Sequence, residues 1–388
     1  MDILIVTSGM LTGLSMTGLT PVLPHIEAEL GTPGAETGSY LVKMIVAIVG
    51  LSIMLAAPLS EVIGRRFRCG TVLIVSFTAF AGASIVSSLA PTLELLVAAR
   101  FVQGIGVAIG VTTLLALAAT LYPGTTRDRL LGLHMGGSAF ALLVLLPVAG
   151  ILGDIDWRLA PLLGLLALFH LALAICARRE LSFNLGKTSG RSIPLTGEEL
   201  RQAALVGALS FLIGAVIYSG PAFVPFKLVA VGIASAMMIG LIGTLAVATS
   251  ALSSFSYALV ASRLSRPGVY LFALPCCGLG ALLVAVADVG WIVAMGQLVS
   301  GVGGGLIVAH IYADSAERFR PELRARTTGL IKSSSFAGLF VGPLLLQFVV
   351  AHASINAAFV AIALGSGLAL AAALSGRSRP SEHGRGRQ

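Results

Sequence analysis

The chain has 388 residues, of which 56% are hydrophobic and only 11% are charged, and its net charge is +8. Its mean hydropathy of +0.97 and its recurring apolar runs of roughly 20 residues are typical of membrane-spanning helices and exclude a water-soluble globular protein. The runs are continuously apolar instead of alternating at every second residue, which excludes a transmembrane β-barrel. We therefore expect an all-α membrane protein.

The apolar runs predict twelve transmembrane helices. In chain order they cover residues 3–24, 39–59, 70–90, 92–121, 130–152, 159–177, 202–226, 233–262, 269–287, 289–312, 328–351 and 355–374. A polar, Gly- and Pro-containing segment divides them into two sets of six. The predicted domains are a six-helix bundle at 1–177, a cytoplasmic linker at 178–201, a second bundle at 202–375 and a basic disordered tail at 376–388.

Basic residues gather in alternate connections between these helices. They include Arg65, Arg66, Arg68, Arg127, Arg129, Arg178, Arg179, Arg263, Arg266, Arg318 and Arg320. The opposite connections hold only Arg158 and Lys227. Under the positive-inside rule, both termini and the linker are cytoplasmic, in a multi-pass protein of the inner membrane. This topology accounts for the basic pI of about 9.7, so no nucleic-acid partner is predicted.

The first predicted helix begins at residue 3 and no small-residue cleavage site follows it, so we expect it to be retained. The four cysteines have no His or acidic neighbours at metal-ligand spacing, and we predict no metal and no cofactor. The predicted helices also lack a nucleophile with a base or a pair of carboxylates, which argues against an enzyme.

The two halves of the chain repeat each other. Residues 100–106 read Arg-Phe-Val-Gln-Gly-Ile-Gly, and residues 297–303 read Gln-Leu-Val-Ser-Gly-Val-Gly. At the same offset, Arg127 pairs with Arg324 and Arg129 with Arg326. A duplicated six-helix unit allows two bundles to rock about a site near the bilayer midplane, so transport is the predicted function.

Several motifs resemble those of the major facilitator superfamily. Residues 57–66, Ala-Pro-Leu-Ser-Glu-Val-Ile-Gly-Arg-Arg, are similar to the family's loop motif Gly-x-Leu-Ala-Asp-Arg-x-Gly-Arg-Arg, and Arg100 to Gly106 resemble its helix-four motif. Pro147 and Gly150 match only part of the Gly-Pro-x-x-Gly-Gly pattern of antiporting drug exporters, because Leu146 and Ile151 replace two glycines. The resemblance, closest to the twelve-helix drug-exporter-like branch, implies two pseudo-symmetric six-helix bundles.

The resemblance also implies a solute cavity lined by polar positions of the first, fourth, seventh and tenth helices. The implied lining residues are Ser15, Thr17, Arg100, Gln103, Tyr218, Ser219, Gln297 and Ser300. Their hydroxyl, amide and guanidinium groups can hydrogen-bond a solute in an apolar pocket. The alternative is that they form hydrogen bonds between helices.

A second set of residues is implied to control conformation. Glu61, Gly64, Arg65 and Arg66 would form a cytoplasmic latch between the halves, with Gly64 permitting a tight turn. The alternative is that the two arginines anchor the topology at lipid headgroups. Close helix packing is predicted at Gly104, Gly106, Pro147, Gly150, Gly301 and Gly303.

Three basic residues, Lys43, Arg100 and Lys332, fall within predicted helices. Arg100 is the deepest, and because a buried charge is costly we expect it to face the interior and to favour a neutral or anionic solute. Lys43 and Lys332 lie near helix ends and can instead extend to the interface.

The sequence shows no obvious carboxylate deep within a predicted helix. Proton coupling would then need His134, His170 or His310, although each can equally be a hydrogen-bonded packing residue.

The sequence thus predicts a monomeric secondary transporter that moves a small organic solute by alternating access, as a proton-coupled exporter of drugs or metabolites. Its predicted partners are the solute, protons and the lipid bilayer. One alternative is an importer or facilitator of an organic anion or another metabolite. An alternative of another class is a solute sensor on a transporter scaffold.

Overall fold

The computed structural model describes residues 1–31, 36–184, 196–320 and 323–375. Residues 185–195 of the predicted linker and the predicted tail 376–388 lie outside the described residues, as does the side chain of Glu61. The described residues form α-helices and two 3₁₀ helices without strands, which confirms the predicted all-α fold.

The helices fall into two sequential sets. The first set comprises α1 (Asp2–Thr17), η1 (Thr20–Val22), α2 (Leu23–Leu30), α3 (Glu36–Arg66), α4 (Cys69–Ser88), α5 (Leu93–Leu121), α6 (Gly124–Ile155), η2 (Trp157–Leu166) and α7 (Ala167–Cys176). The second comprises α8 (Gly197–Ala230), α9 (Ala236–Phe255), α10 (Tyr257–Arg263), α11 (Arg266–Val286), α12 (Gly290–Arg318), α13 (Arg324–His352) and α14 (Ile355–Ser375). We call them the first and second halves.

Within the described residues, twelve helical stretches are long and apolar enough to cross a membrane, as predicted. The first is interrupted: α1, η1 and α2 form one stretch, and Pro21 and Pro24 lie at the break because proline cannot donate the backbone hydrogen bond of a continuous helix. The sixth begins as a 3₁₀ helix, η2, before it continues as α7.

Helix α8 starts at Gly197, before the predicted boundary at residue 202. Its start is fixed by a capping box, in which Thr196 accepts a hydrogen bond from the Glu199 amide and the Glu199 side chain accepts one from the Thr196 amide. The preceding described segment packs on the first half, because Leu181 and Phe183 carbonyls accept hydrogen bonds from Gly70 and Cys69.

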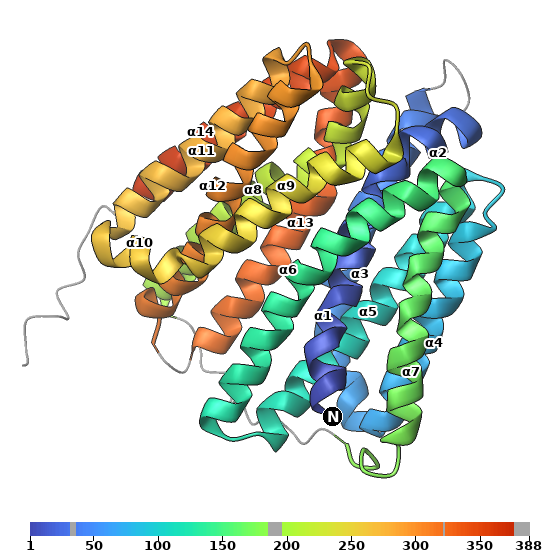
Figure 1. Cartoon of the computed structure of the whole chain (residues 1–388). Coiled ribbons are helices and arrows are strands. Elements are labelled where there is room, and N and C mark those ends of the chain that lie inside the picture. The colour runs from blue at the N-terminus through green and yellow to red at the C-terminus, as the bar shows by residue number, and fades with distance from the viewer. Residues whose placement is uncertain (32–35, 185–195, 321–322, 376–388) are drawn as a thin grey trace, which may run out of the picture.

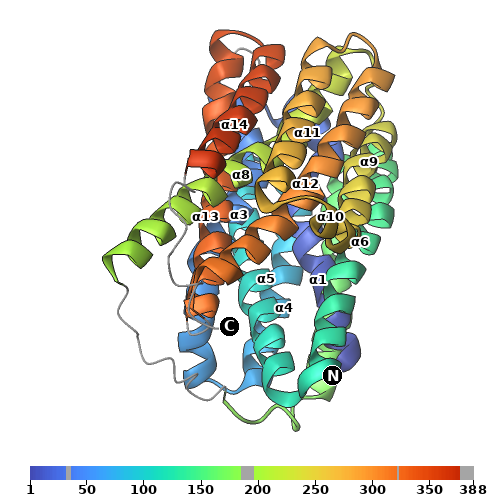
Figure 2. The same ribbon diagram turned by 90° about the vertical axis from the view of Figure 1, so that its left-hand side faces the viewer.

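The two halves lie side by side, with α4 and α7 at one side of the molecule and α11 and α14 at the other (Figure 1). Helix α3 packs against α13, and α6 packs against α9, so these two pairs join the halves. Buried apolar residues form one core cluster centred on the first half and two in the second. Figure 2 shows the second half in front of the first.

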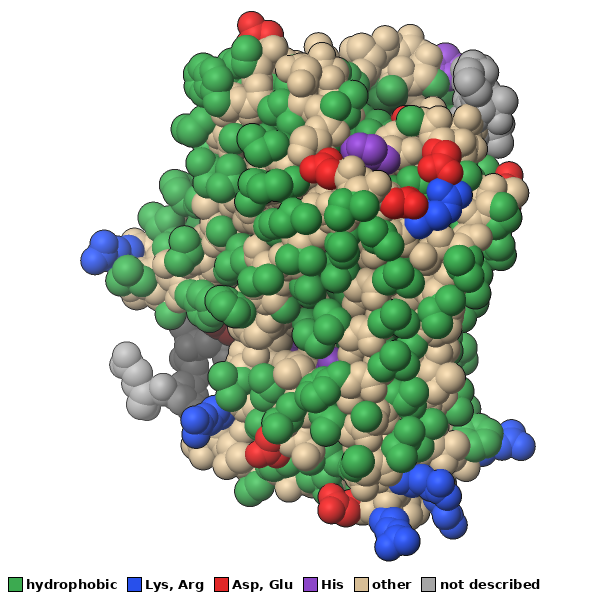
Figure 3. Space-filling model, turned by 45° about the vertical axis from the view of Figure 1, so that its right-hand side comes forward, with side chains coloured by type: hydrophobic (Ala, Val, Ile, Leu, Met, Phe, Trp, Pro, Cys, Tyr) green, Lys and Arg blue, Asp and Glu red, His purple; other side chains and the backbone are tan. Residues whose placement is uncertain are grey.

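The two ends of the helical bundle differ in charge. One end, the basic end, carries Arg65, Arg66, Arg263, Arg266 and Arg318, near the start of α1 and the end of α14. The other, the Asp154 end, carries the end of α6 and the starts of α9 and α12. Figure 3 shows one face of the molecule, on which Lys and Arg side chains (blue) lie mainly toward the lower end and Asp and Glu side chains (red) lie beside a histidine near the upper end.

Candidate functional site

A cavity of about 610 Å³ lies between the halves and extends into the second half. Its walls come from α1, α6, α8, α9, α11, α12 and α14, and they include Leu142, Phe255, Phe359 and Ile362. Among the described residues that line it, none carries a charged side chain. A solute in this cavity would therefore meet a largely apolar surface with a few hydrogen-bonding groups.

Four of the eight implied cavity residues line this space: Thr17, Tyr218, Gln297 and Ser300. The Thr17 hydroxyl already donates to the Gly13 carbonyl, at 3.0 Å. By contrast, the side chains of Tyr218, Gln297 and Ser300 have no hydrogen-bond partner within the described part of the chain. These three groups therefore present unused hydrogen-bonding capacity at the cavity wall.

Close helix packing brings Gln297 and Ser300 to the cavity wall. Helices α11 and α12 approach each other at Gly280 and Gly296, where an added Cβ on Gly280 would meet the Ser300 amide nitrogen and the Gly296 carbonyl oxygen at 2.6 Å. Any larger residue at position 280 would push α12 away. The position of these two polar side chains therefore depends on glycines of the neighbouring turns.

The other four implied residues do not line the cavity. Arg100 is 2% exposed and donates from Nε to the Ile45 carbonyl at 3.2 Å, from Nη2 to the Ser15 carbonyl and from Nη1 to Gln103 Oε1. Gln103 in turn donates to Ser84 Oγ at 2.8 Å. This network joins α1, α3, α4 and α5 within the first half, which is the interhelical arrangement that the sequence left as the alternative.

Ser15 and Ser219 are fully buried. Ser15 Oγ donates to the Thr12 carbonyl at 2.9 Å. Ser219 Oγ has no hydrogen-bond partner among the described residues, and it lies against α13, where a Cβ added to Gly342 would meet it at 2.7 Å. Both serines thus occupy helix-packing positions.

The glycines named from the sequence lie at close helix contacts. An added Cβ on Gly104 would meet Ser52 of α3, and one on Gly106 would meet the Ser76 carbonyl of α4 at 2.8 Å. Gly301 approaches Thr249 of α9, and Gly303 approaches the Ala273 carbonyl of α11.

Pro147 and Gly150 of α6 face α9 in the same way, where Gly240 and Ala236 contact their backbone. A side chain at Gly150 would overlap the Ala236 carbonyl. This contact is between the two halves, so its small residues govern how closely the halves approach.

Two of the three histidines named as coupling candidates are held in the first half. His134 is 4% exposed, and its Nδ1 donates to the Ile5 carbonyl at 2.9 Å. His170 is fully buried, and its ring nitrogens lie 3.0 Å from Thr7 Oγ1 and 3.2 Å from the Leu166 carbonyl. Neither ring lines the cavity.

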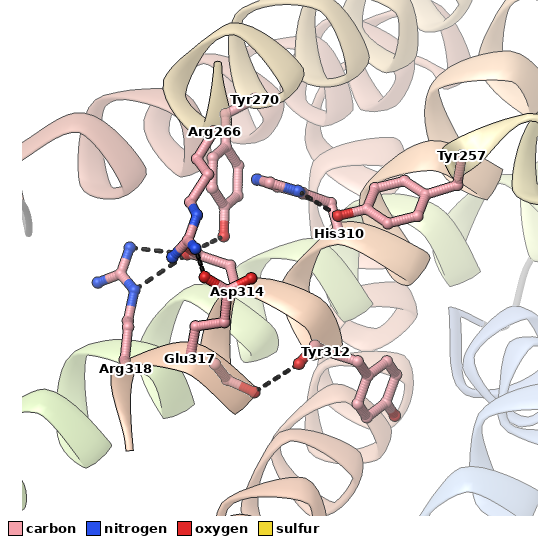
Figure 4. Close-up of polar contacts among 9 residues, drawn as sticks. Tyr257, Arg266, Tyr270, His310, Tyr312, Asp314, Glu317 and Arg318 are labelled. Atoms are coloured by element: carbon pink, nitrogen blue, oxygen red, sulfur yellow. Dashed lines mark hydrogen bonds and ion pairs between the residues drawn. The ribbon is translucent and has the colours of Figure 1, made fainter. Parts of the chain in front are cut away.

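His310 belongs to a polar cluster at the basic end of the second half (Figure 4). Its Nδ1 lies 3.0 Å from the Tyr257 hydroxyl, and its ring packs edge-on against Tyr270 with centroids 4.5 Å apart. The Tyr270 hydroxyl donates to Asp314 at 3.0 Å, and Arg318 donates to the same carboxylate at 2.7 Å.

Tyr257 belongs to α10, in the connection between two membrane-spanning helices. Burial, together with the negative charge of Asp314, raises the pKa of its hydroxyl above the usual value. Arg266 lies 3.9 Å from Asp314 and also pairs with Glu317. The spacing of Asp314 and Arg318, one helical turn apart, was a sequence signal for this cluster.

The remaining basic residues occupy different surroundings. Lys43 is 4% exposed, and its Nζ lies 2.9 Å from the Phe226 ring centroid and 5.6 Å from that of Phe223, so α3 contacts α8 across the halves. Lys332 is exposed. It lies near enough to His134 for an electrostatic interaction across the halves.

The latch residues lie at the basic end. Gly64 is inside α3 and not at a turn, because the helix continues to Arg66. Arg65 and Arg66 have exposed side chains, and the Arg65 carbonyl accepts a hydrogen bond from Asn184 at 3.0 Å. The side chain of Glu61 lies outside the described residues, so the latch stays a prediction.

Sequence reasoning missed the role of Asp154, at the end of α6. Its carboxylate accepts hydrogen bonds from Ser235 Oγ at 2.8 Å, from the Ala236 amide at 2.6 Å and from the Met237 amide at 3.1 Å. These donors belong to the start of α9, in the other half. Among the described residues, no three His, Cys, Asp or Glu side chains gather as a metal site would require.

Comparisons with known proteins agree with this architecture. A sequence model of the Major Facilitator Superfamily matches residues 5–233 and again residues 204–388. The two matches together cover nearly the whole chain.

The curated relatives are matched over part of their length. The uncharacterised MFS-type transporter EfpA of Mycobacterium tuberculosis is 31% identical over 173 residues, which are 44% of this chain and 32% of EfpA. The uncharacterised MFS-type transporter YdgK of Bacillus subtilis is 25% identical over 197 residues, which are 48% of this chain and 47% of YdgK. The chain therefore matches less than half the length of each relative.

Solved structures match over almost the entire chain. The nucleoside transporter NupG has a TM-score of 0.75 at 12% identity, covering 98% of this chain and 99% of NupG. An inward-facing, occupied bacterial homologue of the human lysosomal transporter Spinster has a TM-score of 0.77 at 13% identity, covering 98% of each chain. At such identities the likeness shows the shared fold.

Proposed function

Since this chain belongs to the Major Facilitator Superfamily, we propose that it exports an uncharged, largely apolar organic solute across the cytoplasmic membrane by alternating access. One observation carries the proposal: the cavity between the halves is lined without a charged side chain among the described residues, and offers Tyr218, Gln297 and Ser300 as hydrogen-bonding groups. A charged solute would lose its hydration there without gaining a counter-ion.

The surroundings of Arg100 favour a neutral solute over an anion. Its guanidinium is directed to carbonyl and amide oxygens of its own half, and it does not line the cavity. An anion in the cavity would therefore have no direct contact with this positive charge.

Two observations support export and the orientation. The basic end would face the cytoplasm under the positive-inside rule, with both termini on that side. The partial match of Pro147 and Gly150 to the pattern of antiporting drug exporters favours export. As part of the same proposal, the export of the solute is coupled to the entry of protons, which makes the protein an antiporter.

A growth assay tests solute class and direction. Cells that express the protein are compared with cells carrying an empty vector for sensitivity to chloramphenicol, which is neutral, to ethidium, a cation, and to fusidate, an anion. We expect protection against the neutral compound, and loss of that protection with Gln297→Leu. Increased sensitivity to the neutral compound would favour import, and protection against fusidate alone would contradict a neutral solute.

Counterflow in proteoliposomes separates transport from sensing. Vesicles loaded with unlabelled chloramphenicol should transiently accumulate the labelled compound, because exchange requires a site that is exposed to each side in turn. Binding without counterflow would identify a sensor on a transporter scaffold. An imposed pH gradient that changes accumulation would support proton coupling.

A further inference from the structure

The contact between α6 and α9 at the Asp154 end combines a tight backbone contact with a charged group. Gly150 of α6 and Gly240 of α9 leave no room for side chains, because added Cβ atoms would meet the Ala236 carbonyl of α9 and the Leu146 carbonyl of α6, respectively. Small residues thus let the two helices touch where the halves meet.

The charged group is the carboxylate of Asp154, which caps a helix of the other half. The first amides of a helix have no partner within it. At α9, the Ala236 and Met237 amides donate to Asp154, and the Met238 amide donates to Ser235 Oγ at 3.3 Å. Ser235 in turn donates its hydroxyl proton to Asp154.

Only the ionised carboxylate makes this cap strong. A negative charge is favoured at a helix amino terminus, and hydrogen bonds to it are stronger than those to a neutral acceptor. Protonation of Asp154 would remove this charge and weaken all three hydrogen bonds that the carboxylate accepts. Asp154 is exposed, so it exchanges protons with the solution at its own end of the molecule.

Other titratable and charged groups at this end of the molecule lie on α2 and in the segment after α6. His25 of α2 interacts electrostatically with Asp154, and its Nδ1 is buried without a hydrogen-bond partner among the described residues. Glu29 is paired with Arg158, and Asp156 accepts a hydrogen bond from the Arg158 amide. Glu27, also of α2, accepts one from Ser39. Neither η1 nor the first turn of α9 carries a titratable side chain.

From this geometry we propose that Asp154 is a pH-sensitive latch: its carboxylate holds the halves together at the Asp154 end, and protonation lets them separate there. The proton enters and leaves on the same side, so it regulates the opening and is not carried across. The latch is independent of the solute proposed above.

Distances between spin labels on the two halves test the latch. Labels are attached at Leu89→Cys and Val286→Cys, which are 71% and 73% exposed at the Asp154 end of the first and second halves. For this measurement, the four native cysteines are replaced by alanine, and the protein is reconstituted in lipid nanodiscs. A second pair, at Phe67 and Leu264, reports on the basic end.

In the parent chain we expect the population with a long distance at the Asp154 end to stay small from about pH 8 to about pH 4 and to rise below that pH, because an aspartate has an ordinary pKa of about 3.9 and the hydrogen bonds from Ser235, Ala236 and Met237 favour its charged form. Asp154→Asn, which keeps the shape but not the charge, should show the larger population throughout and no pH dependence. His25→Gln should shift the transition to higher pH, because the electrostatic interaction with His25 favours the charged form of the Asp154 carboxylate.

Asp156→Asn is the matched control, because Asp156 lies two residues from Asp154 but caps η2, a helix of its own half. It should behave like the parent. An Asp154→Asn chain with the parent's distances at every pH would overturn the proposal, as would an equal effect of Asp156→Asn. A chain that transports nothing but still opens with pH would refute the solute proposal and leave the latch intact.

Discussion

Helices α5 and α12 occupy the same place in the internal repeat but use it differently. In α5, the side chains of Arg100 and Gln103 bond to other helices of the first half. In α12, the repeat places Gln297 and Ser300 at those positions, and both face the cavity. One copy of the motif thus holds its bundle together, while the other lines the cavity.

The largest expected effect concerns Arg100. Arg100→Met would leave the Ser15 and Ile45 carbonyls and the Gln103 side-chain oxygen without their donor, and each buried acceptor left unsatisfied costs about 1–3 kcal/mol. We expect a clear fall in the apparent thermal unfolding temperature of the purified protein in detergent. The matching change in the other half, Gln297→Met, should leave that temperature almost unchanged, and equal falls would contradict the comparison.

The next position of the repeat is a glycine in both halves, Gly104 and Gly301. Unlike Arg100 and Gln297, these two glycines have the same role, so equal effects are expected there. Each faces a hydroxyl and a carbonyl of a neighbouring helix, so Gly104→Ala and Gly301→Ala should each lower stability by about 1–3 kcal/mol through overpacking. Gly304→Ala is the control, since an added Cβ there meets nothing within 4 Å. Thermal unfolding of the three variants measures this.

A smaller effect is expected for Gln297, on the KM for the transported solute. Gln297→Leu keeps the size of the side chain but removes its hydrogen bonds, each worth about 1 kcal/mol. The KM for transport of a neutral solute should rise about five- to tenfold, while expression stays at the parent level. Ser366→Ala should leave the KM unchanged, because the Ser366 side chain of α14 does not line the cavity and its hydroxyl already donates to the backbone carbonyl of Ile362.

The smallest effect is expected at Tyr257. Its pKa is raised in the folded protein, so the protonated hydroxyl contributes stability that is complete below the unfolded value of about 10 and is lost as the pH rises through the folded pKa. Tyr257→Phe should therefore lose less stability than the parent between neutral and strongly alkaline pH. Unfolding temperatures across that range provide the measurement.

The fold followed from the sequence because helix length, apolar runs and an internal repeat are properties of neighbouring residues. Twelve spans and the family were predictable in this way. The break after α1 was signalled by Pro21 and Pro24, and the early start of α8 by Thr196 and Glu199.

The site was harder to predict, because the direction of a side chain depends on packing between distant helices. Arg100 and Gln297 have equivalent sequence positions. Only the structure shows that the Ser15 and Ile45 carbonyls accept hydrogen bonds from Arg100. Asp154 gave no sequence signal, since its partners at Ser235 and Ala236 are remote in the chain.

The central claim is that α12 contacts the solute while the equivalent part of α5 is sealed inside its bundle. The most direct measurement is the rate at which N-ethylmaleimide labels Ser300→Cys and Gln103→Cys in membranes, with and without chloramphenicol. We predict rapid labelling at position 300, slowed by the solute, and almost none at position 103. Solute-protected labelling at position 103, with an unreactive position 300, would contradict the account.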